Sequence, residues 1–247
     1  MIDIHSHILY GIDDGSKSIE ESISMINEAK EAGFTAIIST SHYIEESYNA
    51  NKNKREELIK SLEENVEGIE IYNGAEAYVS KNMCKLIQQG ILPTLGNSKY
   101  LLFELPMNSK ILNLDDIIYD LMSDKIVPII AHPERYSYVQ QDPNILIDLI
   151  NKGVLFQCNY ASIDGKYGIA AKKTIKKLLK HNMVHFLGTD THRQNSIYTH
   201  IPETCKKIEK IIGKEKLMEL STYNPSKILK NEDIEIEEPI KIKKFII

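Results

Sequence analysis

Seven short, largely apolar segments alternate with segments of helical periodicity along this chain. The apolar segments are residues 1–4, 35–40, 69–74, 100–103, 126–131, 154–158 and 183–188. Strands of a parallel sheet that are buried on both faces are short and apolar in this way. Because no linker-like composition interrupts the alternation, it predicts one α/β domain over residues 1–247, a single (β/α)7 TIM-like parallel barrel.

The helical segments carry recognisable start and stop signals. Ser18 and Glu21 have the spacing of a capping box, and the apolar helical face that follows ends at Gly33. Further helices are predicted over 54–66, 83–89, 114–121, 144–152, 169–180, 203–212 and 216–220, before a turn at Asn224-Pro225 and a final short helix. Residues 232–247 form a C-terminal tail that alternates at period two, as an added edge strand or a subunit contact would.

The composition excludes several classes of protein. A net charge of -5 over 247 residues argues against a nucleic-acid binder with a broad basic surface. No apolar run approaches the roughly 18 residues of a membrane-spanning helix, so no membrane insertion is expected. Three widely spaced cysteines give no disulfide framework and suit a reducing compartment. We therefore expect a cytoplasmic protein.

The first strand ends in a histidine pair, His5 and His7. Side chains two residues apart on a strand point to the same face, so both imidazoles can converge on one point. Neutral imidazole is the commonest protein ligand for transition metals. Taken alone, the pair is equally well explained as two solvated histidines at a strand end.

Further metal-ligand residue types recur where six of the seven predicted strands end, and only segment 154–158 lacks one. Together with one residue of the first loop they are His5, His7, Asp14, His42, Glu76, Glu104, His132, Asp190 and His192. The active site of a parallel barrel lies at the carboxyl ends of its strands. The remaining histidines, His181, His185 and His200, fall elsewhere and are predicted to be structural or solvated.

Nine ligands are too many for one ion and enough for three if one carboxylate bridges. Nitrogen and carboxylate ligands without thiolate suit manganese, iron or zinc. Three divalent ions against four carboxylates leave a charge of about +2, which complements a phosphate monoester. Ions about 3.5–4 Å apart generate a hydroxide nucleophile and clamp a transferring group in line, which favours phosphoryl transfer.

Thiol-based phosphatase chemistry is excluded by inspection. It needs an arginine six residues after a cysteine, because thiolate and guanidinium must cradle one phosphate. Gly90, Asp164 and Ile211 stand at these positions after the three cysteines, Cys84, Cys158 and Cys205.

Three motifs lie at or near the predicted strand ends: His5-Ser6-His7, the Gly-Ile-Asp-Asp-Gly of residues 11–15, and His132-Pro133-Glu134-Arg135. Through them the chain resembles the PHP (polymerase and histidinol phosphatase) superfamily. Within it, the chain resembles the bacterial tyrosine-protein phosphatases of capsule and exopolysaccharide loci. The similarity runs over nearly the whole chain. It implies a metal-dependent phosphatase acting on a phosphotyrosine protein, with the C-terminal tail of a bacterial tyrosine kinase that controls polysaccharide synthesis as the expected partner.

The resemblance also implies a distorted sevenfold barrel that holds three metal ions, most often manganese. Carried over by position, His5, His7, Glu76 and Asp190 hold the first ion, Glu76, Glu104 and His132 hold the second, and Asp14, His42 and His192 hold the third. Glu76 then bridges two ions. The ligands implied by the resemblance are the same nine residues that lie at the predicted strand ends and in the first loop.

Arg135 is the candidate catalytic residue outside the metal ligands. Its guanidinium is expected to bind phosphoryl oxygens and stabilise charge in the transition state; the alternative is a surface arginine paired with Glu134. Tyrosine, with a pKa of about 10, is a good leaving group, so no general acid is assigned.

Two substrate contacts are weaker hypotheses. Arg193 directly follows His192, whereas the resembling proteins have an asparagine there and an arginine several residues later, so Arg193 either replaces that arginine or the contact is missing. Tyr43 and Tyr48 follow His42 and either contact a phosphotyrosine peptide or are solvated loop residues.

Three other functions remain compatible with these residues. The first is another PHP phosphoesterase, acting on histidinol phosphate, a similar small phosphomonoester or a nucleic-acid end. The second is a hydrolase of the amidohydrolase type, which also begins with His-x-His but acts on a neutral carbonyl. The third is a non-catalytic barrel that binds a partner at its mouth, although acids and histidines crowded without metal would be unfavourable.

Overall fold

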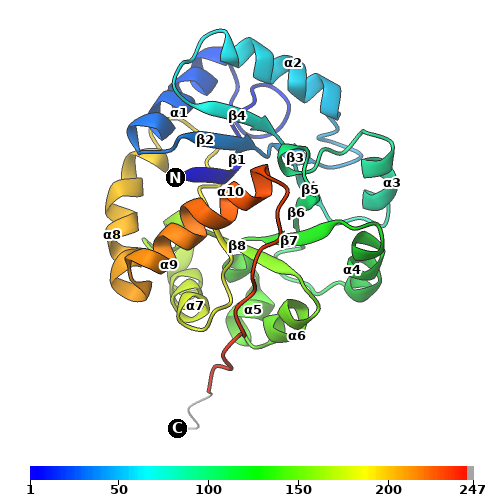
Figure 1. Ribbon diagram of the computed structural model, residues 1–247, viewed down its shortest axis with the longest axis vertical. Coiled ribbons are helices and arrows are strands. Elements are labelled where there is room, and N and C mark those ends of the chain that lie inside the picture. Colours follow the sequence, from blue (N-terminus) through cyan, green and yellow to red (C-terminus); the bar gives the residue numbers. More distant parts are fainter. Residues whose placement is uncertain (244–247) are drawn as a thin grey trace.

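The computed structural model describes residues 1–243, and in it parallel strands curl around an apolar interior with helices outside (Figure 1). The strands are β1 (Ile2–Ser6), β2 (Ala36–Ser39), β3 (His42–Tyr43), β4 (Glu70–Asn73), β5 (Glu76–Tyr78), β6 (Tyr100–Glu104), β7 (Val127–Ala131), β8 (Leu155–Asn159) and β9 (Phe186–Gly188). They form two parallel sheets of order β1-β2-β4 and β3-β5-β6-β7-β8-β9. The predicted α/β architecture with a curled parallel sheet is confirmed.

Three predicted strands are shorter than expected: those over 35–40, 69–74 and 183–188, the last of which is reduced to β9. The first two are each followed by a second short strand. β2 gives way to β3 after Thr40-Ser41, and β4 gives way to β5 after Gly74-Ala75. A Cβ atom on Gly74 would lie 2.9 Å from Cγ2 of Ile38, so the chain passes too close to β2 for any side chain. These breaks move β3 and β5 into the second sheet, where His42 pairs with Glu76.

The outer strands β1 and β9 also meet. Asp190, just beyond β9, donates its backbone N–H to the carbonyl of His5 over 2.7 Å. The backbone N–H of His7 donates to the carbonyl of Thr191 over 2.9 Å. Ser6 and Thr191 form a parallel bridge. The two sheets therefore curl until the ends of β1 and β9 lie together.

The helices surround the strands. They are α1 (Ile19–Glu31), α2 (Lys52–Glu63), α3 (Met83–Gln88), α4 (Leu114–Ser123), α5 (Ser137–Gln141), α6 (Ile145–Asn151), α7 (Gly168–Lys180), α8 (Ile201–Ile212), α9 (Lys214–Met218) and α10 (Asn224–Leu229). Ser18 caps α1 by accepting a hydrogen bond from the backbone N–H of Glu21 over 3.3 Å. The predicted turn at Asn224-Pro225 is wrong, because α10 begins there and proline is tolerated in a first helical turn.

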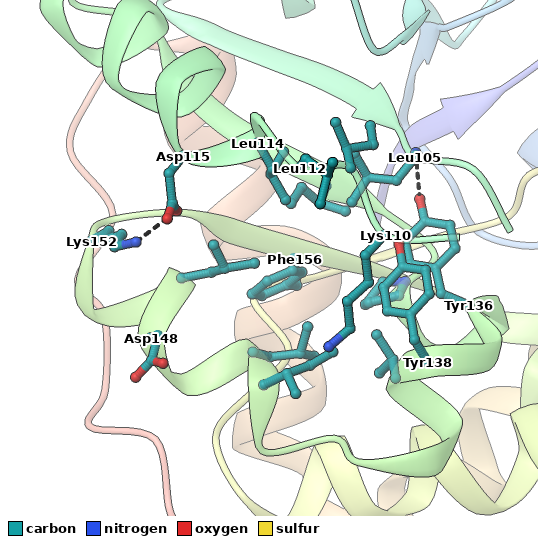
Figure 2. A pocket seen from close by; sticks show the side chains of 17 residues that line it. Leu105, Lys110, Leu112, Leu114, Asp115, Tyr136, Tyr138, Asp148, Lys152 and Phe156 are labelled. Atoms are coloured by element: carbon teal, nitrogen blue, oxygen red, sulfur yellow. Dashed lines mark hydrogen bonds and ion pairs between the residues drawn. The ribbon is translucent and has the colours of Figure 1, made fainter. Parts of the chain in front are cut away.

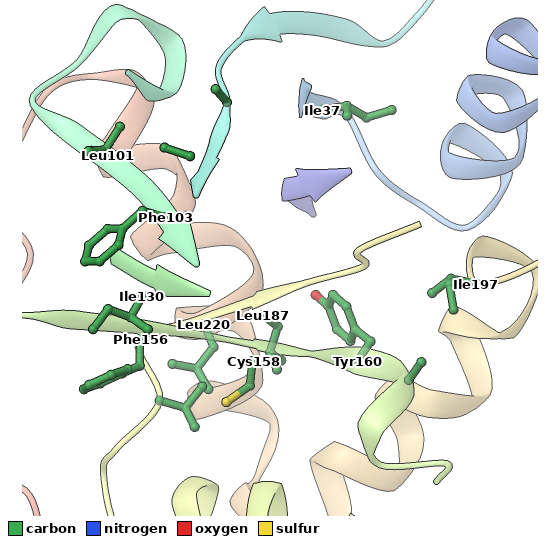
Figure 3. Packing of buried hydrophobic residues seen from close by; sticks show 14 of the residues in the cluster. Ile37, Leu101, Phe103, Ile130, Phe156, Cys158, Tyr160, Leu187, Ile197 and Leu220 are labelled. Atoms are coloured by element: carbon green, nitrogen blue, oxygen red, sulfur yellow. The ribbon is translucent and has the colours of Figure 1, made fainter. Parts of the chain in front are cut away.

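Buried side chains form an inner and an outer layer. Along β6, Leu102 belongs to the inner cluster, whereas Leu101 and Phe103 belong to the outer cluster between sheet and helices (Figure 3). Burying one such side chain stabilises the fold by roughly 1.5–3 kcal/mol. The side chains of each parallel strand thus point alternately into the barrel and out towards the helices. Apolar residues fill both layers, and the polar residues lie at the ends of the strands.

A separate apolar cavity of about 250 Å³ lies outside β7 and β8, under α4, α5 and α6 (Figure 2). Phe156, Tyr138 and Leu114 line it, and an ion pair between Asp115 and Lys152, 2.6 Å apart, lies at one end. None of the nine candidate metal ligands lines this cavity.

The C-terminal tail lies along the molecule, although its last residues, 244–247, are outside the described part. Residues 232–243 form no strand. Ile240 donates its backbone N–H to the carbonyl of His181 over 2.9 Å, and Ile242 donates to Oδ1 of Asn144 over 2.8 Å. Among the helices of residues 1–243, none combines the length and apolar character that crossing a bilayer requires.

Candidate metal centre

His5 in β1 and His7 just after it point to the same place, as the strand periodicity predicts. Both side chains are fully buried, and their Nε2 atoms are 3.3 Å apart. The alternative of two solvated histidines is therefore wrong.

The other seven candidate ligands converge on the same rim. Three groups bring their donor atoms within 4.8 Å of one another: His5, His7, Glu76 and Asp190; His7, Asp14, His42 and His192; and His42, Glu76 and Glu104. His132 joins them through Nε2, which lies 2.8 Å from Oε1 of Glu76. The structure thus assembles all nine residues in one cluster, and the three histidines predicted to be structural lie outside it.

Glu76 is at the centre of the cluster and is fully buried. Its Oε2 lies 3.1 Å from Nε2 of His5, 3.3 Å from Nε2 of His7 and 3.1 Å from Nδ1 of His42. Despite these short distances, neither Oε2 of Glu76 nor Nδ1 of His42 makes a hydrogen bond. Buried polar atoms without partners are costly. This donor set fits divalent cations, which would satisfy these atoms.

The electrostatics of the cluster lead to the same conclusion. Burial, followed by the charge of Glu76, raises the pKa of Glu104 to about 8. Burial lowers the pKa of His5, but the carboxylates of Glu76 and Asp190 outweigh it and raise the pKa to about 9. The pKa of Glu104 thus rises beside a second carboxylate, and the pKa of His5 rises between two carboxylates. Both shifts reflect buried negative charges held close together, which bound cations would neutralise.

Two candidate ligands have an unusual backbone conformation. His132 and Asp190 have positive φ angles of 35° and 53°. Such strain persists only where the surroundings impose it, and it concentrates at functional sites. Next to Asp190, Thr189 donates its backbone N–H and its hydroxyl to the buried carboxylate of Asp3 over 3.0 and 2.6 Å. Together with the hydrogen bond from Asp190 to His5, these contacts hold Asp190 at the rim.

Arg135 contacts the cluster directly. Its Nη1 donates to Oδ2 of Asp190 over 2.7 Å, and its guanidinium lies 4.5 Å from the ring centre of Tyr167. Glu134 turns away from it and accepts from the hydroxyl of Ser162 over 2.6 Å. The alternative of an Arg135–Glu134 surface pair is therefore wrong.

The two weaker substrate contacts are placed differently. Arg193 donates to the backbone carbonyls of Asp14 and His192 over 2.7 and 2.6 Å, so its guanidinium braces the first loop. Tyr43 is only 5% exposed and belongs to the outer apolar cluster, which leaves little of it for a substrate. Tyr48 instead stacks on His42, with ring centres 6.1 Å apart.

Arg55 is a site residue that sequence reasoning missed. It is fully buried in α2 and donates to the carbonyls of Ser41, His42 and Gly74 over 2.8, 2.7 and 3.1 Å. It therefore fixes the breaks after β2 and β4, which place His42 and Glu76. Nothing in its charged, helical sequence context distinguishes it from a surface arginine.

Asp13, Gln157 and Asn159 were also missed. Asp13 and Gln157 accept hydrogen bonds from candidate ligands, and Asn159 donates one to Asp190. Asp13 stands beside Asp14 in the sequence, and the two amides end the one strand that carries no ligand, so their positions could have drawn attention.

The chain is similar to a known protein family and to named bacterial proteins. The capsular polysaccharide synthesis family CpsB/CapC matches residues 1–230. The tyrosine-protein phosphatase CpsB of Streptococcus agalactiae is 32% identical over 241 residues, covering 94% of this chain and 99% of its own length. The tyrosine-protein phosphatase YwqE of Bacillus subtilis is 30% identical over 248 residues, covering 99% of this chain and 97% of its own length.

The fold agrees with this similarity. A solved structure from work on YwqE of Bacillus subtilis and CpsB of Streptococcus pneumoniae, described as metal-dependent tyrosine phosphatases, superposes with a TM-score of 0.93. That match is 29% identical and covers 99% of this chain and 100% of the other. A phosphotriesterase homology protein of Escherichia coli, 12% identical with a TM-score of 0.58, shares the general fold. The chain therefore belongs to the CpsB/CapC family, whose named relatives here are tyrosine-protein phosphatases.

Proposed function

We propose that this chain is a metal-dependent protein-tyrosine phosphatase. The observation that carries the proposal is the convergence of nine nitrogen and carboxylate donors, with Arg135 beside them, at one rim. Relatives of about 30% identity over nearly the full chain are named tyrosine-protein phosphatases. These names favour phosphotyrosine over histidinol phosphate, a neutral amide or a non-catalytic role.

We assign three divalent ions to the cluster, with manganese favoured and iron or zinc as alternatives. His5, His7, Glu76 and Asp190 would hold the first, Glu76, Glu104 and His132 the second, and Asp14, His42 and His192 the third. The first and third sets lie within groups whose donor atoms the fold brings close together, and the second set shares Glu76 and Glu104 with another such group. Bound there, such ions supply an activated water and neutralise phosphoryl oxygens.

The chain itself would bind and orient the substrate. Within the guanidinium of Arg135, only Nη1 makes a hydrogen bond among the described residues, so the other N–H groups of the guanidinium are available to phosphoryl oxygens. Its hydrogen bond to Asp190 and its contact with Tyr167 fix the plane of the guanidinium. A cation held in place beside the phosphoryl oxygens stabilises the negative charge that develops on them in the transition state. It lowers the activation barrier because the guanidinium need not reorganise during the reaction.

Cysteine chemistry offers no competing route. Burial, followed by Asp124, raises the pKa of Cys84 to about 11, and burial raises the pKa of Cys205 to about 11 as well. Cys158 is buried, and burial raises the pKa of its thiol well above the ordinary value. None of these three thiols is an activated nucleophile.

We infer that the architecture is a (β/α)7 barrel in one domain. In this architecture β2 with β3 is one interrupted barrel strand, and β4 with β5 is another. The hydrogen bonds between the ends of β1 and β9 would close the barrel. Contacts of residues 232–243 with the start of α6 and the end of α7 support including the tail in the same unit.

For the biological partner, we propose a phosphorylated bacterial tyrosine kinase, bound through its C-terminal tail in the cytoplasm. The family description, capsular polysaccharide synthesis, supports this role. The three free thiols support a reducing compartment.

The test compares hydrolysis of a phosphotyrosine peptide, the matching phosphoserine peptide and histidinol phosphate by the purified chain. We expect manganese-dependent turnover of the phosphotyrosine peptide that chelator abolishes, with about three bound ions per chain by elemental analysis. Faster turnover of histidinol phosphate would favour the other PHP phosphoesterases. Metal binding without turnover of any substrate would favour the binding barrel.

A further inference from the structure

β8 is the one barrel strand with none of the nine candidate ligands in it or just beyond its end, yet it ends in two buried amides. Gln157 and Asn159 are both fully buried at the rim, two residues apart on the same face. Amide groups buried at this depth need hydrogen-bond partners. Their partners are two of the candidate ligands.

The two amides connect His5 to Asp190. Nδ1 of His5 lies 2.7 Å from Oε1 of Gln157, and Nε2 of Gln157 donates to Oδ1 of Asn159 over 2.9 Å. Nδ2 of Asn159 then donates to Oδ2 of Asp190 over 2.6 Å. The result is a continuous relay of three hydrogen bonds between residues of β1, β8 and the loop after β9.

The carboxylate at one end determines the direction of every bond in this relay. An ionised Asp190 can only accept, so Asn159 must present its amino group to it and its carbonyl oxygen to Gln157. Gln157 must then donate to Asn159 and turn its own carbonyl oxygen to His5. The Nδ1 atom of His5 therefore carries a proton, which leaves Nε2 as the metal-binding atom that faces Glu76 and Asp190, 3.1 and 3.5 Å away.

Gly188 in β9 provides the space for the relay. A Cβ atom at this position would lie 2.7 Å from Cβ of His5 and 2.8 Å from Nε2 of Gln157. Any side chain there would displace one of them, so this glycine is required by close approach rather than by its backbone angles.

We propose that Gln157 and Asn159 are positioning residues that orient His5 and Asp190 for metal binding while adding no charge to the site. Histidine ligands commonly donate their second N–H to a carboxylate, a carbonyl or water. His7 follows the first pattern, because Asp13 accepts from it over 2.8 Å, whereas His5 has a neutral amide instead.

The neutrality of this partner has a consequence for phosphate binding, which rests on the proposed function. Three divalent ions, four ligand carboxylates, Asp13 and Arg135 leave the site with a net charge of about +2. A carboxylate at position 157 would halve that charge within a few ångströms of the ions. The site would then hold metal well but attract the phosphate dianion less.

Two variants separate these roles. Gln157→Leu removes the acceptor for His5 without adding charge. Gln157→Glu retains that acceptor but adds a charge and loses the N–H that Gln157 donates to Asn159. Calorimetric titration of manganese into the metal-free chain should show an affinity about 10–100-fold lower for Gln157→Leu. Manganese affinity of Gln157→Glu should fall less, staying within about tenfold of the parent chain, because Nδ1 of His5 keeps its acceptor although Asn159 loses a donor.

Phosphate binding should show the opposite pattern. Inorganic phosphate titrated into the manganese-saturated chain should bind about tenfold more weakly to Gln157→Glu and within about twofold to Gln157→Leu. Asn224→Leu is the matched control, since Asn224 is a buried amide that donates to the carbonyl of His185 over 3.0 Å. It should leave both affinities unchanged.

Asn159→Ala provides a second break in the relay and should lower manganese affinity in the same direction as Gln157→Leu. Equal manganese affinity in Gln157→Leu and the parent chain would overturn the positioning role. Unchanged phosphate affinity in Gln157→Glu would overturn the charge argument. Neither titration depends on turnover, so a failure of the proposed phosphatase activity would be recognised separately, in the peptide assay.

Discussion

The carboxylate of Asp13 accepts a hydrogen bond from Nδ1 of His7 over 2.8 Å. The same oxygen accepts the backbone N–H of His42 over 2.7 Å, and the other oxygen accepts the backbone N–H of Gly15 over 2.9 Å. One buried side chain thus orients the candidate ligand just after β1, the start of β3 and the loop that carries Asp14.

Asp13→Asn is therefore expected to weaken metal binding. An amide can accept only through one oxygen, so its amino group would face a backbone N–H or the ring of His7. We expect manganese affinity to fall about 10–100-fold, measured by calorimetry on the metal-free chain. Equal affinities in the variant and the parent chain would contradict this role.

Arg135→Lys should lower turnover far more than metal binding. A lysine retains a positive charge near Asp190 but loses the planar set of N–H groups that would contact phosphoryl oxygens. We expect kcat for a phosphotyrosine peptide to fall about 10²–10³-fold. Elemental analysis should show unchanged metal content, and turnover within about threefold of the parent chain would rule out the assigned role.

Arg55→Met should destabilise the fold. The substitution leaves buried carbonyls at the breaks after β2 and β4, including those of His42 and Gly74, without a donor. We expect the free energy of unfolding to fall by about 3–5 kcal/mol, measured by chemical denaturation in the presence of chelator. Lys54→Met, an exposed neighbour on α2, is the control and should change it by less than about 0.5 kcal/mol.

His185 should make the fold acid-sensitive. It is buried, and Nδ1 accepts the backbone N–H of Phe156 over 3.0 Å. Burial, followed by the charge of Lys216, lowers the pKa of His185 to about 3. Below a pH of about 6.5 the unfolded chain binds a proton that the folded chain does not, so stability falls as the pH falls towards the folded-state pKa.

This loss amounts to about 2–3 kcal/mol between pH values of about 6.5 and 4.5. The variant His185→Gln removes the titrating group but keeps an acceptor for the backbone N–H of Phe156, so its stability should depend less on pH over this range. Unfolding free energies measured at several pH values in chelator provide the test. His200→Gln, at an exposed histidine, is the control, and the same pH slope in both variants would contradict the assignment.

The amino-acid sequence alone predicts the alternation of strands and helices and the metal-ligand residues at the strand ends. Both are local: strand burial appears as short apolar runs, and parallel strands bring their carboxyl ends to one rim whatever their exact pairing. The strand ends therefore place four candidate ligands in one group from sequence alone: His5, Glu76, His132 and Asp190. The capping of α1 by Ser18 was equally local.

Which polar residues support that cluster depends on the folded arrangement of the strands and helices. Arg55, Gln157 and Asn159 act through partners that are distant in sequence. Nothing in the helix around Arg55 distinguishes it from a surface arginine, and the position of the two amides at the end of β8 does not indicate which ligands they contact. The same holds for the interruptions after β2 and β4 and for the burial of Tyr43. Hydrogen bonds between elements depend on how the strands curl, and a local pattern does not encode that curvature.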